Sequence, residues 1–379
     1  MSKFFEEVML PECHAARRQI GIFSCGAGMR LATKIADRIK EIQPLYNKLT
    51  GRDEPVGDVL INRPDEDKKP EEQWFANGEV CPNIKESLRN RDVFIIQDTA
   101  NTTTGRSVND HLLALILTVN AAKQGAYAPY VNAVSLYLPY ERQDKIQGRQ
   151  SYSAALILKI MDLAGADNFV TLDIHNEALM GVPNPKGMRL ENMIASKSLI
   201  DYIDLHPDVV DISNAVVIAP DTGAVGRNKF YANFFEKRFG FFYKVRDYSE
   251  ANLVKRMDLL GEVKGKDVLV FDDMADTCGT LLKCARILKD RGAKRINVGV
   301  SNALLSGSAT DSMMKAYEQE LLSRCLITNS IFHGDNFCQQ YPVFSEVDVS
   351  NYTAEGIFCI NHETSLSEML SHYKKKDDD

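Results

Sequence analysis

Short apolar runs that end in polar or glycine-rich turns recur along this sequence, and segments of helical periodicity follow them. The run Gln19 to Ser24 ends in Cys25-Gly26-Ala27-Gly28 and precedes a helical stretch from Arg30 to Ile42. A strand followed by glycines and a helix is the usual start of an α/β unit. The pattern therefore predicts an α/β protein from its N-terminal region onward.

One pattern of strand, polar loop, helix, glycine and strand occurs twice. In the first copy, the apolar run Val93 to Asp98 ends in an acid, a Thr-rich loop and a helix ending near Gly125 follow, and Val131 to Leu138 forms the next strand. In the second copy, Val268 to Asp273 precedes a helix and then the strand Ile296 to Val300. In that helix one face is shared by Leu281, Ala285 and Leu288.

This repeat predicts two duplicated, doubly wound α/β domains with parallel sheets. A chain of 379 residues with 44% apolar composition can bury a core in each half. We expect an N-terminal domain at 17–192, a C-terminal domain at 193–370 and a charged tail at 371–379. A charged, proline-broken insertion at about 47–73 is expected to be a solvated loop. Ligands are expected at the carboxyl ends of the strands.

Charge and cysteine content narrow the function classes. The net charge of −7 is spread over 45 basic and 52 acidic side chains, so we expect no nucleic-acid partner. The eight cysteines include no C-x-x-C pair and are expected to be reduced cytosolic thiols. No segment has the roughly 18 apolar residues of a membrane span, and the N-terminus lacks a secretory signal pattern. We expect a cytoplasmic protein without a membrane partner.

A phosphate-binding loop is predicted between Val268 and Thr280. The sequence has no G-x-x-x-x-G-K-[ST] motif, and Gly26-Ala27-Gly28 lacks the third glycine of a dinucleotide fingerprint. The successive amides of Asp276-Thr277-Cys278-Gly279-Thr280 at a helix start form a concave donor surface for phosphate. The preceding acids, Asp272 and Asp273, suit ribose hydroxyls or a bridging Mg²⁺. A strand end with an N-cap Thr explains the acids but not the whole run, which favours a phosphorylated sugar.

The run Val270 to Thr280 resembles the ribose-5-phosphate signature of ribose-phosphate pyrophosphokinases. Part of it is shared with type I phosphoribosyltransferases, so this motif alone indicates only the superfamily. The resemblance implies that the two duplicated, doubly wound parallel-sheet domains are of the type I phosphoribosyltransferase-like kind. The resemblance implies that ribose 5-phosphate is bound by Asp272, Asp273, Asp276, Thr277, Cys278, Gly279 and Thr280.

Two further segments resemble the ATP site of this family. Leu138 to Lys145 is similar to its Pro-Tyr-x-Arg-Gln-Asp-Lys segment, and Phe75 to Glu79 to its Phe-x-Asn-x-Glu loop. Arg142 at a strand end can stack on a base and offer a planar fork to phosphate. A lone Phe75 would more often belong to the core. The residues implied in ATP binding are Phe75, Asn77, Glu79, Arg142, Gln143, Asp144 and His175.

The metal site and the catalytic loop are also implied by resemblance. Asp173 and His175 lie two apart at a predicted strand end, so we expect them to share a face. The family implies Mg²⁺ as cofactor, with ligands Asp173, His175 and Asp221. Phe242 to Arg246, followed by Glu250-Ala251-Asn252, is similar to the catalytic loop, whose cations are Lys244 and Arg246. Without that context, a solvated charge run would be the preferred interpretation.

The resemblance spans about Gln19 to Leu370 and implies a reaction. The anomeric oxygen of ribose 5-phosphate attacks the β-phosphorus of Mg-ATP, so AMP leaves and 5-phosphoribosyl 1-pyrophosphate forms. The family also implies homo-oligomers, dimers assembled into hexamers. A non-catalytic regulatory homologue and a phosphoribosyltransferase are the alternatives. The sequence departs from the family pattern at four places: the insertion at about 47–73, a shorter loop after Lys145, Gly226, and Ser301-Asn302-Ala303. These departures put allosteric control in doubt more than catalysis.

Overall fold

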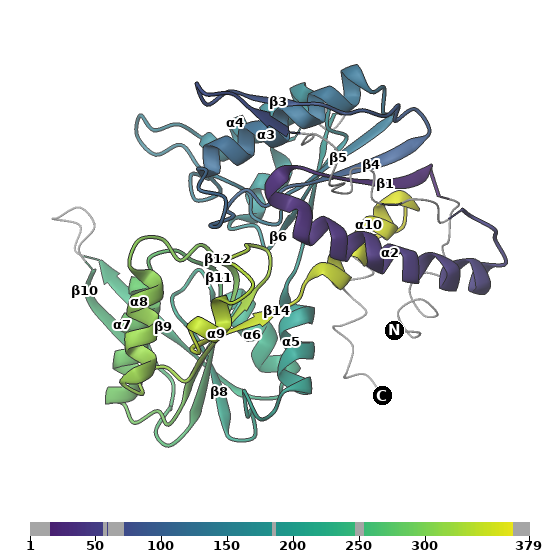
Figure 1. Ribbon diagram of the computed structural model, residues 1–379. Helices are drawn as coiled ribbons and strands as arrows, with labels where there is room; N and C mark the ends of the chain where they lie inside the picture. The colour runs from purple at the N-terminus through teal and green to yellow at the C-terminus, as the bar shows by residue number, and fades with distance from the viewer. Residues whose placement is uncertain (1–15, 56–58, 60–71, 184–186, 247–253, 367–379) are drawn as a thin grey trace. The chain divides into compact units, whose positions relative to one another are not determined.

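The computed structural model describes residues 16–55, 59, 72–183, 187–246 and 254–366, which form two compact α/β units (Figure 1). The first unit runs to Ile194 and also contains Ser330–His333 and the chain from Val349. The second comprises Ala195–Asn329 and Gly334–Asp348. The predicted second domain, 193–370, differs from this unit at its end, because the last helix packs with the first unit.

The first unit is built on a parallel sheet. In spatial order its strands are β1 (Gln19–Ser24), β4 (Arg91–Ile96), β5 (Tyr130–Val134), β6 (Asn168–Leu172) and β7 (Arg189–Met193). The inner strands are buried on both faces, which explains their nearly unbroken apolar sequences. A separate antiparallel hairpin is formed by β2 (Glu72–Trp74) and β3 (Val80–Pro82).

Helices cover both faces of this sheet, as in a doubly wound fold (Figure 1). One face carries α2 (Met29–Thr50) and α10 (Ser350–Asn361), which pack against each other. The other carries α3 (Val108–Asn120), which continues into a π-helical turn at Ala121–Gly125, and α4 (Ser153–Ala164). Two short 3₁₀ turns, Gly26–Gly28 and Glu177–Gly181, follow β1 and β6.

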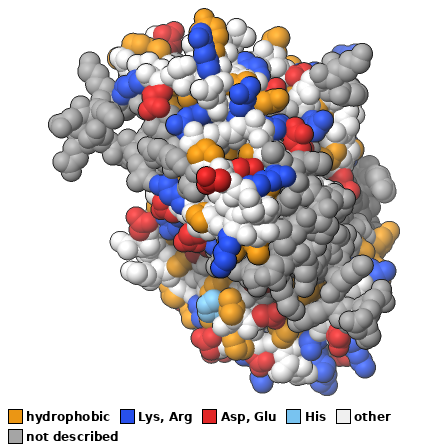
Figure 2. Space-filling model, turned by 90° about the vertical axis from the view of Figure 1, so that its right-hand side faces the viewer, with side chains coloured by type: hydrophobic (Ala, Val, Ile, Leu, Met, Phe, Trp, Pro, Cys, Tyr) orange, Lys and Arg blue, Asp and Glu red, His pale blue; other side chains and the backbone are white. Residues whose placement is uncertain are grey.

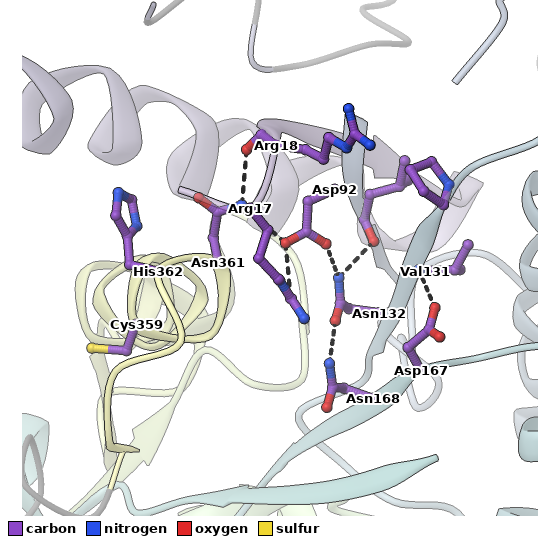
Figure 3. Close-up of polar contacts among 12 residues, drawn as sticks. Arg17, Arg18, Asp92, Val131, Asn132, Asp167, Asn168, Cys359, Asn361 and His362 are labelled. Carbon is purple, nitrogen blue, oxygen red and sulfur yellow. Dashed lines mark hydrogen bonds and ion pairs between the residues drawn. The ribbon is translucent and has the colours of Figure 1, made fainter. Parts of the chain in front are cut away.

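A buried polar network closes the amino end of the first sheet (Figure 3). The carboxylate of Asp92, at the start of β4, is fully buried and accepts hydrogen bonds from Arg17 at 2.9 Å, Asn361 at 2.9 Å and Asn132 at 2.7 Å. Asn168 then donates to Asn132 at 2.6 Å. Since Asn361 is the last residue of α10, this network anchors the C-terminal helix to the first unit.

The second unit has a larger mixed sheet. Its order is β10 (Val254–Leu260), β9 (Arg238–Arg246), β8 (Ala215–Ala219), β11 (Asp267–Ala275), β12 (Ile296–Ala303), β13 (Arg324–Thr328) and β14 (Phe344–Val347). Only the β9–β10 pairing is antiparallel among these strands. The strand order reverses between β8 and β11. This switch point is where ligands bind in doubly wound folds.

The helices of the second unit follow the predicted pattern. They are α5 (Ser196–Leu205), α6 (Val225–Phe234), α7 (Gly279–Asp290), α8 (Ala309–Glu318) and the short α9 (Phe337–Gln340). The predicted apolar face of α7 is confirmed, because Leu281, Ala285 and Leu288 are all buried in the core with α8. The prediction of an α/β fold with parallel sheets is thus confirmed in both units.

The prediction that 47–73 is a solvated loop is wrong at both of its described ends. Helix α2 continues to Thr50, and β2 begins at Glu72. Glu54 folds back and accepts hydrogen bonds from Gln43 at 3.1 Å and from the ring of His362 at 3.1 Å. Its pKa is lowered by hydrogen bonds from the Ala16 amide, His362 and Gln43, although burial alone would raise it. The charged composition of this segment predicted a solvated loop because it gives no sign of these tertiary contacts.

Surface properties agree with the even charge distribution of the sequence. Lys and Arg side chains are interspersed with Asp and Glu on the described part of the face in Figure 2. Within the described ranges, no helix combines the length and apolar character needed to cross a membrane. The tail predicted at 371–379 lies outside the described residues.

Candidate sugar-phosphate and nucleotide sites

The loop between β11 and α7 forms an open helix start at the switch point of the second sheet. Cys278 is the N-cap residue, adopts a left-handed conformation with φ 60° and makes no side-chain cap. A Cβ added at Gly279 would meet only Thr277 Oγ1, at 4.0 Å. The start of α7 therefore has no side-chain cap and has open space beside Gly279, as a phosphate cradle requires.

Cys278 is a structural part of this loop. Its side chain is buried, and burial, followed by the nearby charge of Asp276, raises the pKa of the thiol to about 12. The thiol stays protonated at neutral pH, so it is a poor nucleophile. This environment leaves the backbone amide of Cys278, rather than its sulfur, as the group that could bind a ligand.

Two carboxylates precede the cradle, inside the strand rather than after it. Strand β11 extends to Ala275, two residues beyond the predicted end at Asp273. Burial, and then the charge of Asp273, raises the pKa of Asp272 well above its usual range. The guanidinium of Arg227 lies 3.4 Å from Asp273 and 4.0 Å from Asp272, which partly offsets this repulsion.

Sequence reasoning missed how α6 holds β11 in place. The side chain of Asn228, fully buried in α6, donates to the Phe271 carbonyl at 2.6 Å and accepts from the Phe271 amide at 2.8 Å. This bidentate pair fixes the strand one residue before Asp272. An Asn within a helix carries no sequence signal for such a role.

Asp221 follows β8 and lies on the same edge of the second sheet. Its carboxylate accepts the amides of Gly223 at 3.0 Å and Ala224 at 3.1 Å, and its charge contributes to the raised pKa of Asp272. The structure thus brings Asp221 into electrostatic contact with the ribose-phosphate candidates. A cation there would relieve the repulsion between these carboxylates.

The predicted catalytic cations lie in a β-hairpin. Lys244 and Arg246 are in β9, with backbone positions opposite Met257 and Val254 of β10. The side chains of these residues, and the predicted Glu250-Ala251-Asn252 segment, lie outside the described part of the structure.

In the first unit, the expected adenine-binding turn joins β2 to β3. The Phe75 amide donates to the Glu79 carbonyl at 2.8 Å, and the Glu79 amide donates to Asn77 Oδ1 at 3.1 Å. Gly78, at φ 91°, allows the tight turn. The ring of Phe75 is 46% exposed, so it is not the core residue that a lone Phe would favour.

The second segment expected to bind ATP lies beyond the carboxyl end of β5, which ends four residues before the predicted end at Leu138. Arg142 and Gln143 are exposed, and the Gln143 amide donates to the Tyr140 carbonyl at 2.8 Å. Asp144 is held by Asn176, whose amide group donates to it at 2.6 Å. The exposed side chains leave this segment accessible to a ligand.

The expectation that Asp173 and His175 share one face of a strand is wrong. Strand β6 ends at Leu172, and Asp173 adopts a left-handed conformation with φ 51° that turns the chain. Asp173 is buried, with its amide bonded to the Met193 carbonyl at 2.8 Å, whereas His175 is exposed. Sequence reasoning also missed Glu141, a buried carboxylate that accepts the His175 amide at 3.0 Å.

The expected metal ligands are distributed over both units. Asp173 and His175 belong to the first unit and Asp221 to the second. Within the described residues, no three His, Cys, Asp or Glu side chains form a cluster able to hold a metal ion. Mg²⁺ commonly uses only one or two protein carboxylates together with substrate phosphates.

Comparisons with known proteins match both units. Residues 20–165 match the N-terminal domain of ribose phosphate pyrophosphokinase, and residues 190–322 match the phosphoribosyl transferase domain. Ribose-phosphate pyrophosphokinase 2 of Schizosaccharomyces pombe is 34% identical over 300 residues, covering 78% of this chain and 88% of that protein. The ribose-phosphate pyrophosphokinase of Prochlorococcus marinus is 33% identical over 298 residues, covering 78% and 84%.

A solved structure supports the fold. The phosphoribosylpyrophosphate synthetase of Mycobacterium smegmatis superposes with a TM-score of 0.72 at 24% identity, covering 90% of this chain and 99% of that one. Two findings establish the family. Both units match the family domains, and relatives more than 30% identical match along most of their length. This chain belongs to the ribose-phosphate pyrophosphokinase family.

Proposed function

We propose that this protein is a ribose-phosphate pyrophosphokinase that transfers the β,γ-pyrophosphate of ATP to the anomeric hydroxyl of ribose 5-phosphate, releasing AMP. Family membership supports the reaction class. The observation that carries the assignment to this chain is the open start of α7 beside two carboxylates, because it matches the two chemical halves of a phosphorylated sugar.

The sugar-phosphate would be bound by complementary groups of the second unit. The amides from Asp276 to Thr280 would donate to its phosphate, favoured by the positive end of the α7 dipole. Ionised carboxylates of Asp272 and Asp273 would accept hydrogen bonds from the ribose hydroxyls. The two acids repel each other when both are charged. Hydrogen bonds donated by the ribose hydroxyls would offset this repulsion and favour the charged carboxylates.

ATP would be bound by the first unit. Phe75 would stack on adenine, and Asn77 and Glu79 would make polar contacts to the base. Arg142 offers the opposite stacking surface or a fork for phosphate oxygens. The exposure of Phe75 and Arg142 supports this proposal.

We propose Mg²⁺ as cofactor, held by Asp173, His175 and Asp221 with the phosphates of ATP. Bound there, it would supply charge neutralisation on the transferring group. Lys244 and Arg246 would stabilise the charge that grows on the pyrophosphate and on the departing AMP. Positioning and electrostatics would account for most of the catalysis, with no covalent nucleophile. Omitting the metal should abolish turnover.

The decisive test is AMP release from ATP and Mg²⁺ with and without ribose 5-phosphate, with the sugar product identified by mass. AMP formed only with the sugar, in step with a pyrophosphorylated product, supports the proposal. Folded protein that binds the sugar but releases no AMP would indicate the regulatory homologue instead. Consumption of the pyrophosphorylated sugar with a base would indicate a phosphoribosyltransferase.

We also propose a cytoplasmic protein that assembles into homo-oligomers built from dimers. The family resemblance supports the assembly, and the scattered cysteines without a C-x-x-C pair support the cytoplasmic location. Sedimentation velocity of the full chain tests the assembly, because a monomer of 42.5 kDa at micromolar concentration would contradict it.

A further inference from the structure

The hairpin that carries the Phe75 turn needs support from outside itself. It is a separate two-stranded sheet, and an isolated hairpin of this kind is only marginally stable in water. Helix α3 packs against β3, and β2 is held to the rest of the first unit through Glu72 and Trp74. Neither residue belongs to the motifs identified in the sequence.

Glu72 ties the hairpin to the turn that follows β1. Its carboxylate accepts a hydrogen bond from the backbone amide of Gly26, the first residue of that turn, and another from the indole of Trp74. Glycine at position 26 makes room for this approach, because a Cβ there would lie 2.7 Å from Glu72 Oε2 and would displace the carboxylate. A carboxylate at this helical start is also favoured by the backbone dipoles.

Trp74 ties the hairpin to the loop before α3. The guanidinium of Arg106 lies 3.6 Å from the centroid of the indole ring, a close cation–π stack. The Arg106 amide donates to Thr104 Oγ1 at 3.2 Å, and Thr104 is 2.9 Å from the Nε2 atom of the buried His111 in α3. The stacking partner is therefore itself anchored to the core of the unit.

We propose that Glu72, Trp74 and Arg106 form a brace that positions the Phe75 turn for the adenine base. Trp74 directly precedes Phe75, so holding the half-buried indole fixes the backbone from which the exposed Phe75 ring projects. The three are positioning residues for ATP, not contacts to it. This inference rests on the proposed role of the turn in nucleotide binding.

The test uses Trp74 as its own reporter, because it is the only tryptophan of the chain. Arg106→Gln removes the cation and keeps a long polar side chain. Arg89→Gln is the matched control, since Arg89 stacks on Tyr127 at 4.6 Å elsewhere in the first unit. Acrylamide quenching of tryptophan fluorescence reports the stack, and steady-state kinetics report nucleotide binding.

Arg106→Gln should increase the quenching of Trp74 and raise the KM for ATP by about two- to fivefold, the equivalent of one exposed cation–π contact. The kcat and the KM for ribose 5-phosphate should stay unchanged, and Arg89→Gln should match the wild type. Arg106→Lys, which retains the cation, should recover part of the effect.

Two results would overturn the brace. Increased quenching with an unchanged KM for ATP would show that the stack exists but does not position the turn. Unchanged quenching would show that the stack does not hold in solution. Failure of the proposed function differs from both, because the wild type would then release no AMP, while calorimetric titration with ATP would still compare the variants.

Discussion

The loops after β4 and after β11 occupy equivalent places in two strand–loop–helix units, yet their helix starts differ. The start of α3 is filled by its own side chains: Ser107 accepts the Asp110 amide at 3.2 Å, and Asp110 accepts the Ser107 amide at 2.8 Å. The start of α7 has no side-chain cap and adjoins open space at Gly279.

The acids at the two strand ends also differ in how their charge is compensated. Asp98, after β4, is buried and satisfied by the amides of Phe332 at 2.8 Å and Ala100 at 3.2 Å. Asp272 and Asp273 repel each other and face Arg227. One duplicated unit thus uses its polar groups internally, whereas the other combines an uncapped helix start with two mutually repelling carboxylates. A shared topology alone does not make a site.

The largest expected effect concerns the β9–β10 hairpin, an antiparallel addition at the edge of the second sheet. Lys244→Ala should lower kcat by roughly 10²- to 10³-fold, because it removes charge stabilisation in the transition state. Ribose 5-phosphate binding by calorimetry should be nearly unchanged. Lys283→Ala, at an exposed position of α7, is the control. Lost sugar binding with preserved turnover would exclude the catalytic role.

A pair of glycine substitutions compares an open helix start with a closed one. Gly279→Ala should fold normally but weaken ribose 5-phosphate binding roughly 10- to 100-fold, since it obstructs hydrogen bonds to a charged phosphate. Gly28→Ala should instead destabilise the fold by about 1–3 kcal/mol, because its Cβ would lie 2.3 Å from the Ile96 carbonyl oxygen. Calorimetric titration and thermal denaturation separate the two effects. Normal sugar affinity in Gly279→Ala would place the phosphate elsewhere.

Asp98 should make the stability of the first unit depend on pH. Burial raises the pKa of its carboxyl to about 7, although hydrogen bonds from Phe332 and Ala100 oppose the shift. Its contribution is fully present below the unfolded pKa near 4 and is lost as pH rises through 7. Asp98→Asn should flatten this decline, which is on the order of 2 kcal/mol, in urea unfolding between pH 4 and 8. An identical slope in both proteins would contradict the assignment.

The smallest expected effect concerns the capping box of α3. Ser107→Ala should destabilise the protein by about 1 kcal/mol, because the Asp110 amide loses its side-chain acceptor at the helix start. Turnover should be unchanged, since this helix start is proposed to bind no substrate. Urea unfolding and the AMP-release assay measure the two quantities. A clear loss of turnover at unaltered stability would mean that both helix starts serve the reaction.

Much of the fold could be predicted from the sequence because its periodicity is local. The apolar runs at Gln19–Ser24 and Val268–Asp273 became strands, and the spacing of Leu281, Ala285 and Leu288 gave the buried face of α7. Composition misled where tertiary contacts decide, as for Glu54, whose charge indicated a solvated loop but whose partners come from α2 and the C-terminal region.

The candidate site was less predictable because its supports are distant in sequence. Nothing near Asn228 indicates that its amide group holds Phe271, 43 positions away. The positive φ at Asp173 also has no signature in an apolar strand that ends in Asp, so the shared-face argument for His175 failed. The motifs indicated a candidate site, but the contacts that hold its residues in place could be described only from the structure.

Hydrogen exchange of the full chain with and without ribose 5-phosphate tests most directly whether the open helix start is the sugar-phosphate site. We predict slower hydrogen exchange for the backbone amides of 276–280 when the sugar is present, and unchanged exchange for those of 98–107. Protection of 98–107 instead, or no protection at 276–280 under saturating sugar, would contradict it.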